Sequence, residues 1–439
     1  FRTLRELGPD RILALPPEEQ YLVASGRSYY RGLAFEELRR MQFDLETTGL
    51  DPEHDRIFLV AVRDAVGAVT ILESDPARTL GDAGEADLIR RFVAHLRALD
   101  PDVIENHNLH GFDLPFLAWR AKKLGVPLRL GRDDTIGLRT RPAARGASFE
   151  RDTPMRRTRW TMPGRETIDS MDAVRRYDFA VRELPGHGLK AVARHLGIAG
   201  PDREHVPGAR VYEVFQSDPE RVRRYAADDV HEAAGLAALL GGAAFALAQM
   251  VPRRYERLAD AGAATGVLDP LMVRAYLRAR TALPVHQTHD GTTHSGAALH
   301  LFATGVARRI VKADVASLYP SLMREYRIGP ARDRLGVLVG LVSRLVEQRL
   351  DAKAKGQAAA AGSAERHTYE SLSAAMKLVV NSAYGYLGAA SLTRFSDVHA
   401  ANEVTRRGRA LLDLLCRELA ARGVTLLEAD TDGVYFSVP

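Results

Sequence analysis

The chain of 439 residues has a single cysteine, Cys416, and only seven lysines among its 61 basic residues. One cysteine excludes a disulfide within the chain and fits a reducing compartment such as the cytoplasm. The other 54 basic residues are arginines, so a lysine at any one position is unusual. A lysine beside a candidate site therefore indicates a position where a compact point charge is wanted.

The chain also lacks a hydrophobic run long enough to cross a bilayer. Its longest apolar stretch, GLAALLGGAAFALA at residues 235–248, is shorter than the ~20 residues that a membrane-spanning helix needs. We expect a buried helix there, no membrane partner and no signal peptide at Phe1. The net charge of +5 and the pI of about 9.3 permit a polyanionic partner without requiring one.

The first half of the chain alternates between strand-like and helical patterns. Three strand-like segments, RMQFDLETT, RIFLVAVRD and AVTILES, precede the helical ADLIRRFVAHLRAL and the strand-like DVIEN. This order predicts an α/β domain of the ribonuclease-H-like kind that ends near residue 245. Residues 139–165 interrupt the pattern with eight arginines and form either a solvated loop or a loop that lies on phosphates.

The second half predicts strands combined with a helical hairpin. A helical linker over about 250–283 leads to the strand-like ARRIVKADVASLYP. Helices near 336–355 and 365–384 are joined by the turn GQAAAAGSA, which makes them an antiparallel pair. A helix over 403–421 and a strand over 424–438 follow, so we expect an α/β and α+β multidomain protein.

Carboxylates recur at three places in the first half. FDLETTG places Asp44 and Glu46 on one face of a strand, where two like charges repel unless a cation lies between them. NLHGFDLPFL puts Asp113 in apolar surroundings, five residues after Asn108, and YAADDV places Tyr225 and Asp229 on one face of a helix. A solvated strand face would explain Asp44 and Glu46 alone, and Asp228 is the alternative acid of the helix.

Taken in order, D-x-E, N-x-x-x-F-D and Y-x-x-x-D resemble the three motifs of the 3′→5′ proofreading exonuclease of family B DNA polymerases. The resemblance implies that Asp44, Glu46, Asp113 and Asp229 hold two divalent metals, while Tyr225 orients the attacking water. Phosphodiester hydrolysis calls for such a set independently, because two hard cations on oxygen ligands activate water and stabilise the leaving oxygen. For the arginine-rich residues 139–165, we expect DNA contacts from Arg156, Arg157 and Arg159.

KADVASLYPSLM carries an aspartate at the end of a predicted strand. Asp314 alone could be a helix cap or a buried hydrogen-bond acceptor. The string D-x-x-S-L-Y-P-S, however, is similar to the first palm motif of family B polymerases. That similarity implies metal ligands at Asp314 and at the backbone of Val315. It also implies nucleotide contacts from Ser317 and Leu318 and a steric gate against a 2′-hydroxyl at Tyr319.

Cations lie one turn apart on both helices of the predicted hairpin. EQRLDAK holds Arg349 and Lys353, and KLVVNSAYGYLG holds Lys377 and Asn381. Three cations on two antiparallel helices can converge on a triphosphate, although a solvated surface would explain the first pair alone. The string K-x-x-x-N-S-x-Y-G resembles the second polymerase motif, the fingers helix that holds the nucleotide, with Tyr384 and Gly385 in supporting roles.

EADTDGVYF places Asp430 and Asp432 two residues apart, which predicts that both leave one face of a strand. Gly433 lets a substrate or metal approach the backbone. The segment resembles the third polymerase motif, D-T-D-G. The resemblance makes Asp432 the second shared metal ligand, with Asp314, and gives Asp430 a supporting role.

Together the motifs predict template-directed DNA synthesis by two-metal nucleotidyl transfer, with 3′→5′ proofreading. The implied cofactor is Mg²⁺, two ions per centre, for which Mn²⁺ can substitute. The implied partners are primer–template DNA, single-stranded DNA and dNTPs, and the protein would be nucleoid-associated if bacterial. The alternatives are an exonuclease alone, or a non-catalytic DNA-binding or scaffold subunit with a degenerate polymerase half.

The resemblance also predicts how the chain is divided. We expect an N-terminal segment (1–40), the exonuclease domain (41–245), a linker with the first part of the palm (246–330), the fingers hairpin (331–387) and the second part of the palm (388–439). Other family members have a thumb and a basic palm motif after the third motif, and neither is found in this sequence. Three explanations are open: the sequence is a fragment of a longer enzyme, which we favour, it is a natural minimal polymerase, or a partner chain supplies the thumb.

Overall fold

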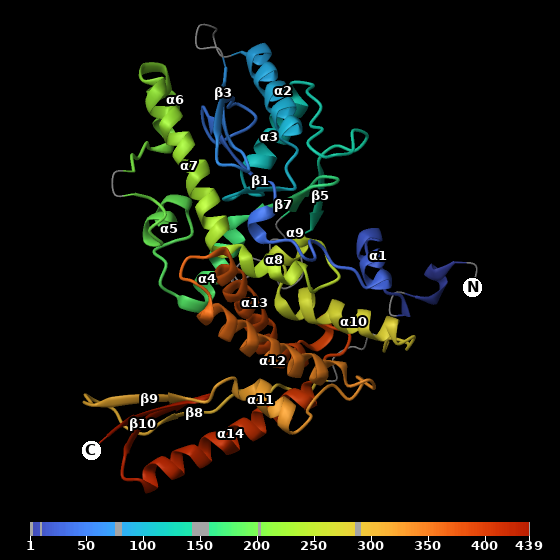
Figure 1. The fold of residues 1–439 in the computed structure, drawn as a ribbon, viewed down its shortest axis with the longest axis vertical. Helices are drawn as coiled ribbons and strands as arrows, with labels where there is room; N and C mark the ends of the chain where they lie inside the picture. The colour runs from blue at the N-terminus through green and yellow to red at the C-terminus, as the bar shows by residue number, and fades with distance from the viewer. Residues whose placement is uncertain are drawn as a thin grey trace. The chain divides into compact units, whose positions relative to one another are not determined.

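The computed structural model describes residues 3–8, 11–74, 81–142, 158–200, 203–285 and 291–438. The chain forms two compact units. Unit 1 comprises residues 1–28, 250–253 and 262–439, and unit 2 comprises residues 29–249 and 254–261. Each unit contains a mixed arrangement of helices around its own β-sheet (Figure 1).

A five-stranded sheet in the order β3-β2-β1-β4-β7 organises unit 2. β1 (Arg40–Thr47), β2 (Ile57–Arg63) and β3 (Val69–Glu73) form the predicted antiparallel meander. β4 (Val103–Asn106) and β7 (Glu166–Asp169) add to the other side of β1 in parallel. The IFLVAVR sequence of β2 is apolar at nearly every position because both faces of the sheet are covered.

Helices cover the two faces of this sheet. α2 (Asp82–Leu99) and α3 (Asp113–Lys123) form one core with Phe43, Leu45 and Val60 of the strands. α6 (Val211–Ser217) and α7 (Pro219–Leu240) form another core with Phe58 and Leu59. The other helices of unit 2 are η3 (Phe35–Glu37), α4 (Ser170–Val181), α5 (Leu189–His195), η4 (Gly208–Arg210), α8 (Gly242–Ala248) and α9 (Tyr255–Ala259).

The apolar stretch 235–248 forms parts of two helices rather than one. α7 ends at Leu240 and α8 begins at Gly242, with a bend of 57° between them. The break coincides with two successive glycines, Gly241 and Gly242, which favour helix ends over helix interiors. Among the described residues, no single helix has the length and apolarity of a membrane span, and this bent pair alone meets those criteria when joined.

The arginine-rich stretch contributes two short paired strands where a loop was predicted. β5 (Arg139–Pro142) pairs antiparallel with β6 (Thr158–Thr161). Arg159 is buried and ion-paired with Asp172 and Asp260, at 2.8 and 3.2 Å. The predicted DNA contact of Arg159 is therefore wrong, because its charge is paired with two acids inside unit 2. Arg156 and Arg157 lie outside the described residues.

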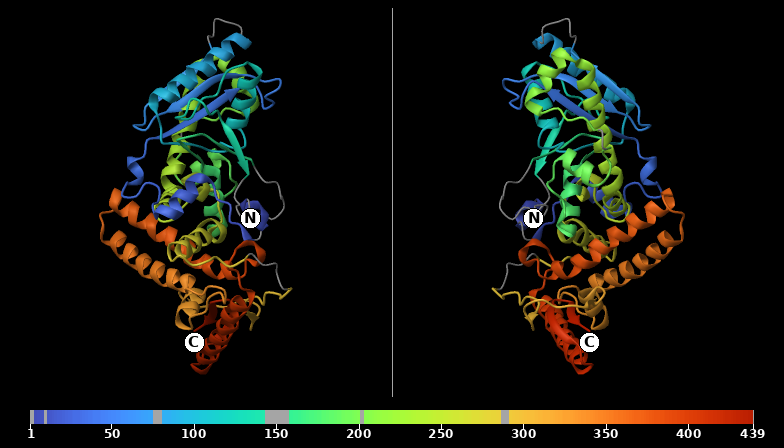
Figure 2. Two further views of the ribbon diagram at one scale, coloured as in Figure 1. Left: turned by 90° about the vertical axis from the view of Figure 1, so that its right-hand side faces the viewer. Right: turned by 90° about the vertical axis from the view of Figure 1, so that its left-hand side faces the viewer.

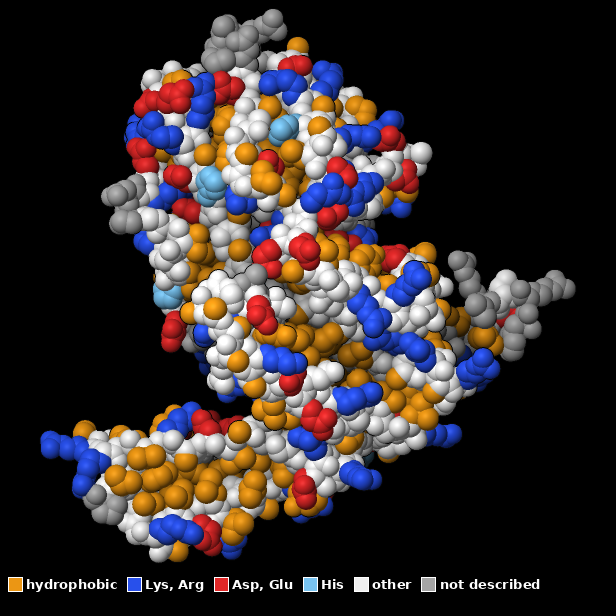
Figure 3. All heavy atoms as spheres, viewed as in Figure 1, with side chains coloured by type: hydrophobic (Ala, Val, Ile, Leu, Met, Phe, Trp, Pro, Cys, Tyr) orange, Lys and Arg blue, Asp and Glu red, His pale blue; other side chains and the backbone are white. Residues whose placement is uncertain are grey.

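Unit 1 is built on a four-stranded antiparallel sheet in the order β8-β10-β11-β9. The strands are β8 (Leu299–Leu301), β9 (Ile310–Asp314), β10 (Thr425–Asp430) and β11 (Gly433–Ser437). α14 (Val398–Ala421) packs on one face, where its Leu412 and Cys416 meet Val434 and Phe436. Exposed hydrophobic side chains gather over the part of unit 1 that holds this sheet and α14 (Figure 3).

The predicted helical hairpin is present in unit 1. α12 (Val337–Ala358) and α13 (Ala364–Leu387) run antiparallel and pack along their length (Figure 2). Ser363 caps α13 by accepting a hydrogen bond from the Arg366 backbone N–H. The remaining elements of unit 1 are η1 (Leu4–Leu7), α1 (Pro17–Ser25), η5 (Ala264–Leu268), α10 (Asp269–Arg278), α11 (Leu318–Glu325) and η6 (Ala390–Leu392).

Candidate active sites on the two sheets

Three predicted carboxylates of unit 2 come together. One oxygen each of Asp44, Glu46 and Asp229 lies within 4.8 Å of the others. β1 supplies the first two on the face that α7 covers, because Phe43 and Leu45 point to the opposite core. α7 brings Asp229 to them from the facing helix. The strand period and the helix packing therefore assemble the three acids.

Burial of these acids disfavours their charged forms. Burial raises the pKa of Asp44 to about 6 and that of Asp229 to about 7, although Lys190 and Arg203 oppose both shifts. Burial, Asp44 and Asp229 all raise the pKa of Glu46. The Oε1 atom of Glu46 is buried without a hydrogen-bond partner. Three close carboxylates, one of them with a buried oxygen that lacks a hydrogen-bond partner, fit a divalent cation, which would supply the missing contact.

Asp113 lies near this cluster but is not among its three members. It is buried at the start of α3, and its pKa is raised by burial, by Asp44 and by Asp169. The backbone before it turns at Asn108, whose φ of +67° is left-handed and whose N–H donates to Asp169. His110 donates its backbone N–H to the same carboxylate. Asp169, which was not predicted from the sequence, therefore fixes the turn that positions Asp113.

Two cations that the motifs do not include face the cluster. Arg203 contacts Asp229 at 2.5 Å, and Lys190 lies 3.4 Å from its other oxygen. The Lys190 ammonium also donates to the Tyr225 hydroxyl and lies 4.0 Å from the centre of that ring. The rarity of lysine was the one sequence signal for Lys190. Arg203 had no such signal, because it is one of 54 arginines and is brought in from a loop.

In unit 1 the strand register aligns the residues of two polymerase-like motifs. Asp430 pairs with Leu299 on one side and Gly433 on the other, and Gly433 pairs with Asp314. Paired residues share a face, so the row places Asp430 and Asp314 on one face with Gly433 between them. A Cβ atom on Gly433 would lie 2.1 Å from the Asp314 Oδ1 atom. Glycine therefore leaves the space that the Asp314 carboxylate occupies.

Asp432 lies in the turn between β10 and β11 and not on the strand face that the spacing predicted. Thr431 has a φ of +56°, which reverses the chain after Asp430. The Asp432 carbonyl accepts a hydrogen bond from the Val315 N–H at 2.7 Å, so the first and third motifs are tied together through their backbones. Burial and the nearby Asp314 raise the pKa of Asp432. Two neighbouring carboxylates fit a shared cation.

Asp314 is much more open than the acids of unit 2. Its side chain is 49% exposed and forms an ion pair with Lys312 at 3.1 Å. Within the described chain, no third acid joins Asp314 and Asp432 in a cluster as tight as that of unit 2. The donor set of unit 1 therefore fits a divalent cation less completely than the donor set of unit 2.

The predicted sugar gate, Tyr319, packs against a second tyrosine ring at a tilt of 41°. The rings of Tyr319 and Tyr384 are 4.4 Å apart, and the Tyr384 hydroxyl lies 2.5 Å from Nε2 of His294. A Cβ atom on Gly408 of α14 would meet the Tyr319 ring at 3.0 Å, so this glycine makes room for the ring. Burial and Asp432 raise the pKa of Tyr319, which places the ring in the field of that carboxylate.

Ser317 and Leu318 form the start of α11. Ser317 has a φ of +52°, and Leu318 is the buried first residue of the helix. The strand-like pattern ARRIVKADVASLYP therefore ends early: β9 stops at Asp314, and Leu318 starts a helix after the left-handed turn at Ser317. This reversal carries Tyr319 away from the line of β9.

The hairpin residues that were predicted to bind a triphosphate lie mostly in solvent. Lys353, Lys377 and Asn381 are exposed, while Arg349 is half-buried and its Nε has no hydrogen-bond partner. In the described part of the chain, neither lysine forms an ion pair, so their charges are available to an anion. Gly385 is also exposed, with open space beside it.

Comparison with known proteins identifies the family. The model described as DNA polymerase family B, exonuclease domain, matches residues 26–192, and that described as DNA polymerase family B matches residues 327–432. DNA polymerase 1 of Pyrococcus abyssi (strain GE5 / Orsay) is 28% identical over 458 residues, covering 97% of this chain and 56% of the relative. DNA polymerase 2 of Aeropyrum pernix is 24% identical over 432 residues, covering 91% of this chain and 50% of the relative.

The fold agrees with these matches. The family B DNA polymerase from the hyperthermophilic archaeon Pyrobaculum calidifontis superimposes with a TM-score of 0.75 at 23% identity, over 97% of this chain and 60% of that one. The mixed multidomain fold predicted from the sequence is therefore confirmed. The chain spans about half the length of these relatives. The chain belongs to the family B DNA polymerases and contains both their exonuclease domain and their polymerase domain.

Proposed function

We propose that this chain extends DNA primers on a template and removes nucleotides from their 3′ ends, at two separate centres. The observation that carries the proposal is the presence of neighbouring carboxylates in both units. Asp44, Glu46 and Asp229 would bind divalent metal in unit 2, and Asp314 and Asp432 would do so in unit 1. We propose Mg²⁺ as the metal, because all of these ligands are hard oxygen donors.

The metal at either centre would activate the attacking oxygen and stabilise the leaving oxygen of an in-line displacement. The side chains of the protein orient the reactants of that step and neutralise their charges. In unit 2, Tyr225 is held by Lys190 at the edge of the acid cluster, in a place to orient a water molecule. In unit 1, Tyr319 would press against the sugar of a bound dNTP, while the exposed Lys353 and Lys377 would neutralise its phosphates.

A second candidate function, exonuclease activity alone, has one observation in its favour. The acids of unit 2 form a three-ligand cluster in the described chain, whereas Asp314 of unit 1 is half-exposed and paired with Lys312. A scaffold without catalysis fits less well, because a buried carboxylate such as Glu46, whose Oε1 atom has no hydrogen-bond partner, destabilises a fold that does not use it.

Primer extension with a labelled primer and Mg²⁺ separates these functions. We expect Asp432→Ala to lower dNTP incorporation about 10³-fold and leave 3′ degradation intact, and Asp44→Ala to do the reverse. If the wild-type chain degrades the primer but never extends it, exonuclease activity alone is the function. If it does neither, both proposed activities are wrong.

A further inference from the structure

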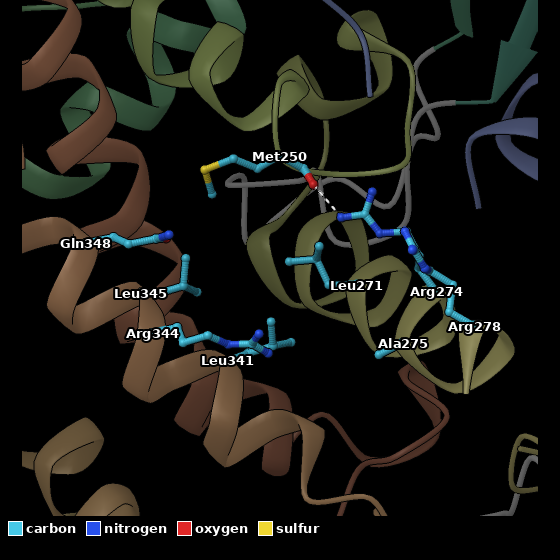
Figure 4. A pocket seen from close by; sticks show the side chains of 9 residues that line it. All are labelled: Met250, Leu271, Arg274, Ala275, Arg278, Leu341, Arg344, Leu345 and Gln348. Carbon is cyan, nitrogen blue, oxygen red and sulfur yellow. Dashed lines mark hydrogen bonds between the residues drawn. The ribbon is translucent and has the colours of Figure 1, made fainter. Parts of the chain in front are cut away.

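Unit 1 contains two features that lie outside the polymerase-like motifs. One is a groove of about 300 Å³ between α10 and α12, which leucine and arginine side chains of both helices line (Figure 4). The other is the segment 293–298, which is neither helix nor strand. This segment is hydrogen-bonded to Tyr384 of the second motif and to Thr431 of the third. The segment is therefore placed to act directly on the proposed metal site of unit 1.

His294 connects this segment to the predicted sugar gate through a second ring. Its Nε2 atom lies 2.5 Å from the Tyr384 hydroxyl, and the two rings meet edge to face with their centres 5.6 Å apart. The Tyr384 ring in turn lies 4.4 Å from the Tyr319 ring. Burial and Tyr319 raise the pKa of Tyr384 to about 12, so the hydroxyl keeps its proton at neutral pH and can donate it to Nε2.

Asn402 of α14 fixes the backbone on both sides of His294. Its Oδ1 atom accepts hydrogen bonds from the N–H and the hydroxyl of Ser295, at 2.8 and 3.0 Å. Its Nδ2 atom donates to the Thr293 carbonyl at 3.2 Å. A segment without regular secondary structure depends on such side-chain partners to satisfy its backbone polar groups. A single asparagine therefore holds His294 in place.

The same segment is tied to the turn that carries Asp432. The Ala298 carbonyl accepts a hydrogen bond from the Thr431 N–H at 3.0 Å, and Thr431 is the residue that reverses the chain before Asp432. Arg409 of α14 donates to the Gly296 carbonyl at 2.7 Å. These bonds fix the segment relative to the proposed metal site.

The Tyr319 ring depends on Tyr384 for its support. α14 approaches that ring through Gly408, which has no side chain with which to hold it. Tyr384 has such a side chain, and it is fixed at both ends, by the backbone of α13 and by the contact of its hydroxyl with His294. A side chain held at both ends samples fewer conformations than one held at its backbone alone.

We propose that His294 is a positioning residue for sugar selection in unit 1. His294 holds the Tyr384 hydroxyl, the Tyr384 ring supports Tyr319, and Tyr319 then keeps the position from which it excludes a 2′-hydroxyl. The inference rests on the proposed polymerase function and on Tyr319 as its sugar gate. It adds a residue that lies 90 positions before Tyr384 and belongs to none of the motifs.

The test compares the incorporation of dCTP and CTP opposite a template guanine, with Mg²⁺ and the full chain. All chains carry Asp44→Ala, so that proofreading does not remove the added nucleotide. The measured quantity is the ratio of kcat/KM for dCTP to kcat/KM for CTP. The variants are His294→Ala, which removes the hydrogen-bond acceptor, and His294→Gln, whose amide oxygen can still accept from the Tyr384 hydroxyl.

Loss of one hydrogen bond corresponds to about a 5-fold change in an equilibrium, so we expect His294→Ala to lower the ratio about 5-fold. We expect His294→Gln to restore most of it. The matched control is His300→Ala, because His300 is an exposed histidine of β8 that contacts Asp413 and Phe302, and it should keep the wild-type ratio. A purely structural role of His294 would lower the incorporation of both nucleotides and leave the ratio unchanged, which would overturn the proposal.

A double-substitution cycle tests the route through Tyr384. Tyr384→Phe removes the hydroxyl and keeps the ring, so we expect it to lower the ratio as His294→Ala does, and the two together to lower it no further. Additive effects would overturn the proposal, because His294 would then act independently of Tyr384. Normal dCTP incorporation with an unchanged ratio in every variant contradicts this inference alone. No dCTP incorporation by the chain with wild-type His294 contradicts the proposed polymerase function, and the inference with it.

Discussion

The sheet of unit 2 is covered by helices on both faces, whereas the sheet of unit 1 leaves one face open. Leu299 and Leu301 of β8, on the face that carries Asp314, are 66% and 67% exposed. In unit 2, by contrast, Phe58 and Leu59 of the inner strand β2 are fully buried. The acids follow their sheets: Glu46 and Asp229 are buried at 7% and 6% exposure, and the Asp314 side chain is 49% exposed.

This difference shows that two centres of similar chemistry are prepared to different degrees. The acids of unit 2 are held together by packing and carry raised pKa values, so they are poised to exchange protons for metal ions. The acids of unit 1 are joined mainly by strand register and one backbone hydrogen bond. We call the buried cluster of Asp44, Glu46 and Asp229 the closed centre, and the pair of Asp314 and Asp432 the open centre. We infer that the closed centre binds metal before DNA arrives, while the open centre needs a substrate to complete its ligands.

The largest expected effect comes from a substitution that disrupts the open centre alone. Gly433→Ala places a methyl group where the Asp314 carboxylate lies, and that flexible carboxylate must swing away from Asp432. We expect dNTP incorporation to fall about 100-fold, because a displacement of about 1 Å costs that much. Exonuclease activity and thermal stability stay near wild type, since the clash is with a side-chain end.

The matched control for that variant is Gly340→Ala within α12. A Cβ atom there meets open space, and alanine favours a helix over glycine. Incorporation should be unchanged in the control. A Gly433→Ala variant as active as this control would show that Asp314 is not needed in its observed position.

A smaller effect is expected when the closed centre loses its lysine. Lys190→Ala removes the ammonium that contacts the Tyr225 hydroxyl and Asp229. A charge-assisted hydrogen bond contributes about 1.5–3 kcal/mol, so we expect 3′ degradation of single-stranded DNA to slow about 30-fold. Polymerase activity should not change. Lys355→Ala is the control, because Lys355 is exposed and contacts Asp351 and Tyr369 on the hairpin. An equal loss there would mean that Lys190 acts by charge alone.

The smallest expected effect is on the free energy of unfolding, which reports how much the buried charge of Asp229 destabilises the closed centre. The folded-state pKa of Asp229 is raised to about 7, so the metal-free folded protein binds more protons than the unfolded chain between about pH 4 and pH 7. Its stability therefore falls as the pH rises through that window. Asp229→Asn removes the charge, and we expect it to raise the free energy of unfolding by about 2 kcal/mol at pH 8 in EDTA, with no gain at pH 4.

Thermal unfolding at the two pH values checks this expectation. Asp228→Asn is the neighbouring control, since Asp228 is 46% exposed and should give no gain at either pH. A destabilised Asp229→Asn variant at pH 8 would show that the ion pair with Arg203 outweighs the cost of burial.

Local periodicity explains which parts of this structure the sequence predicts. Asp44 and Glu46 share a face because the strand runs straight through them, and the same two-residue spacing misleads at Asp430 and Asp432 because Thr431 adopts a left-handed turn. The helical hairpin was predictable from spacing and from the turn between its helices.

Contacts between distant segments were not predictable in this way. Arg203 reaches Asp229 across 26 residues from a loop, and Arg159 finds its acid Asp260 across 101 residues. Neither arginine carries a local signal that separates it from the other arginines of the chain. Likewise, the role of Asp169 in holding the Asn108 turn depends on the parallel pairing of β4 with β7.

The most direct test of the central claim is a Mn²⁺ titration of the DNA-free chain by calorimetry. We predict that the wild-type chain binds Mn²⁺, that Glu46→Gln loses this binding, and that Asp314→Asn keeps it, since the cluster of unit 2 is assembled without substrate. Binding that survives in Glu46→Gln and disappears in Asp314→Asn would contradict the account, because the open centre would then be the one prepared in advance.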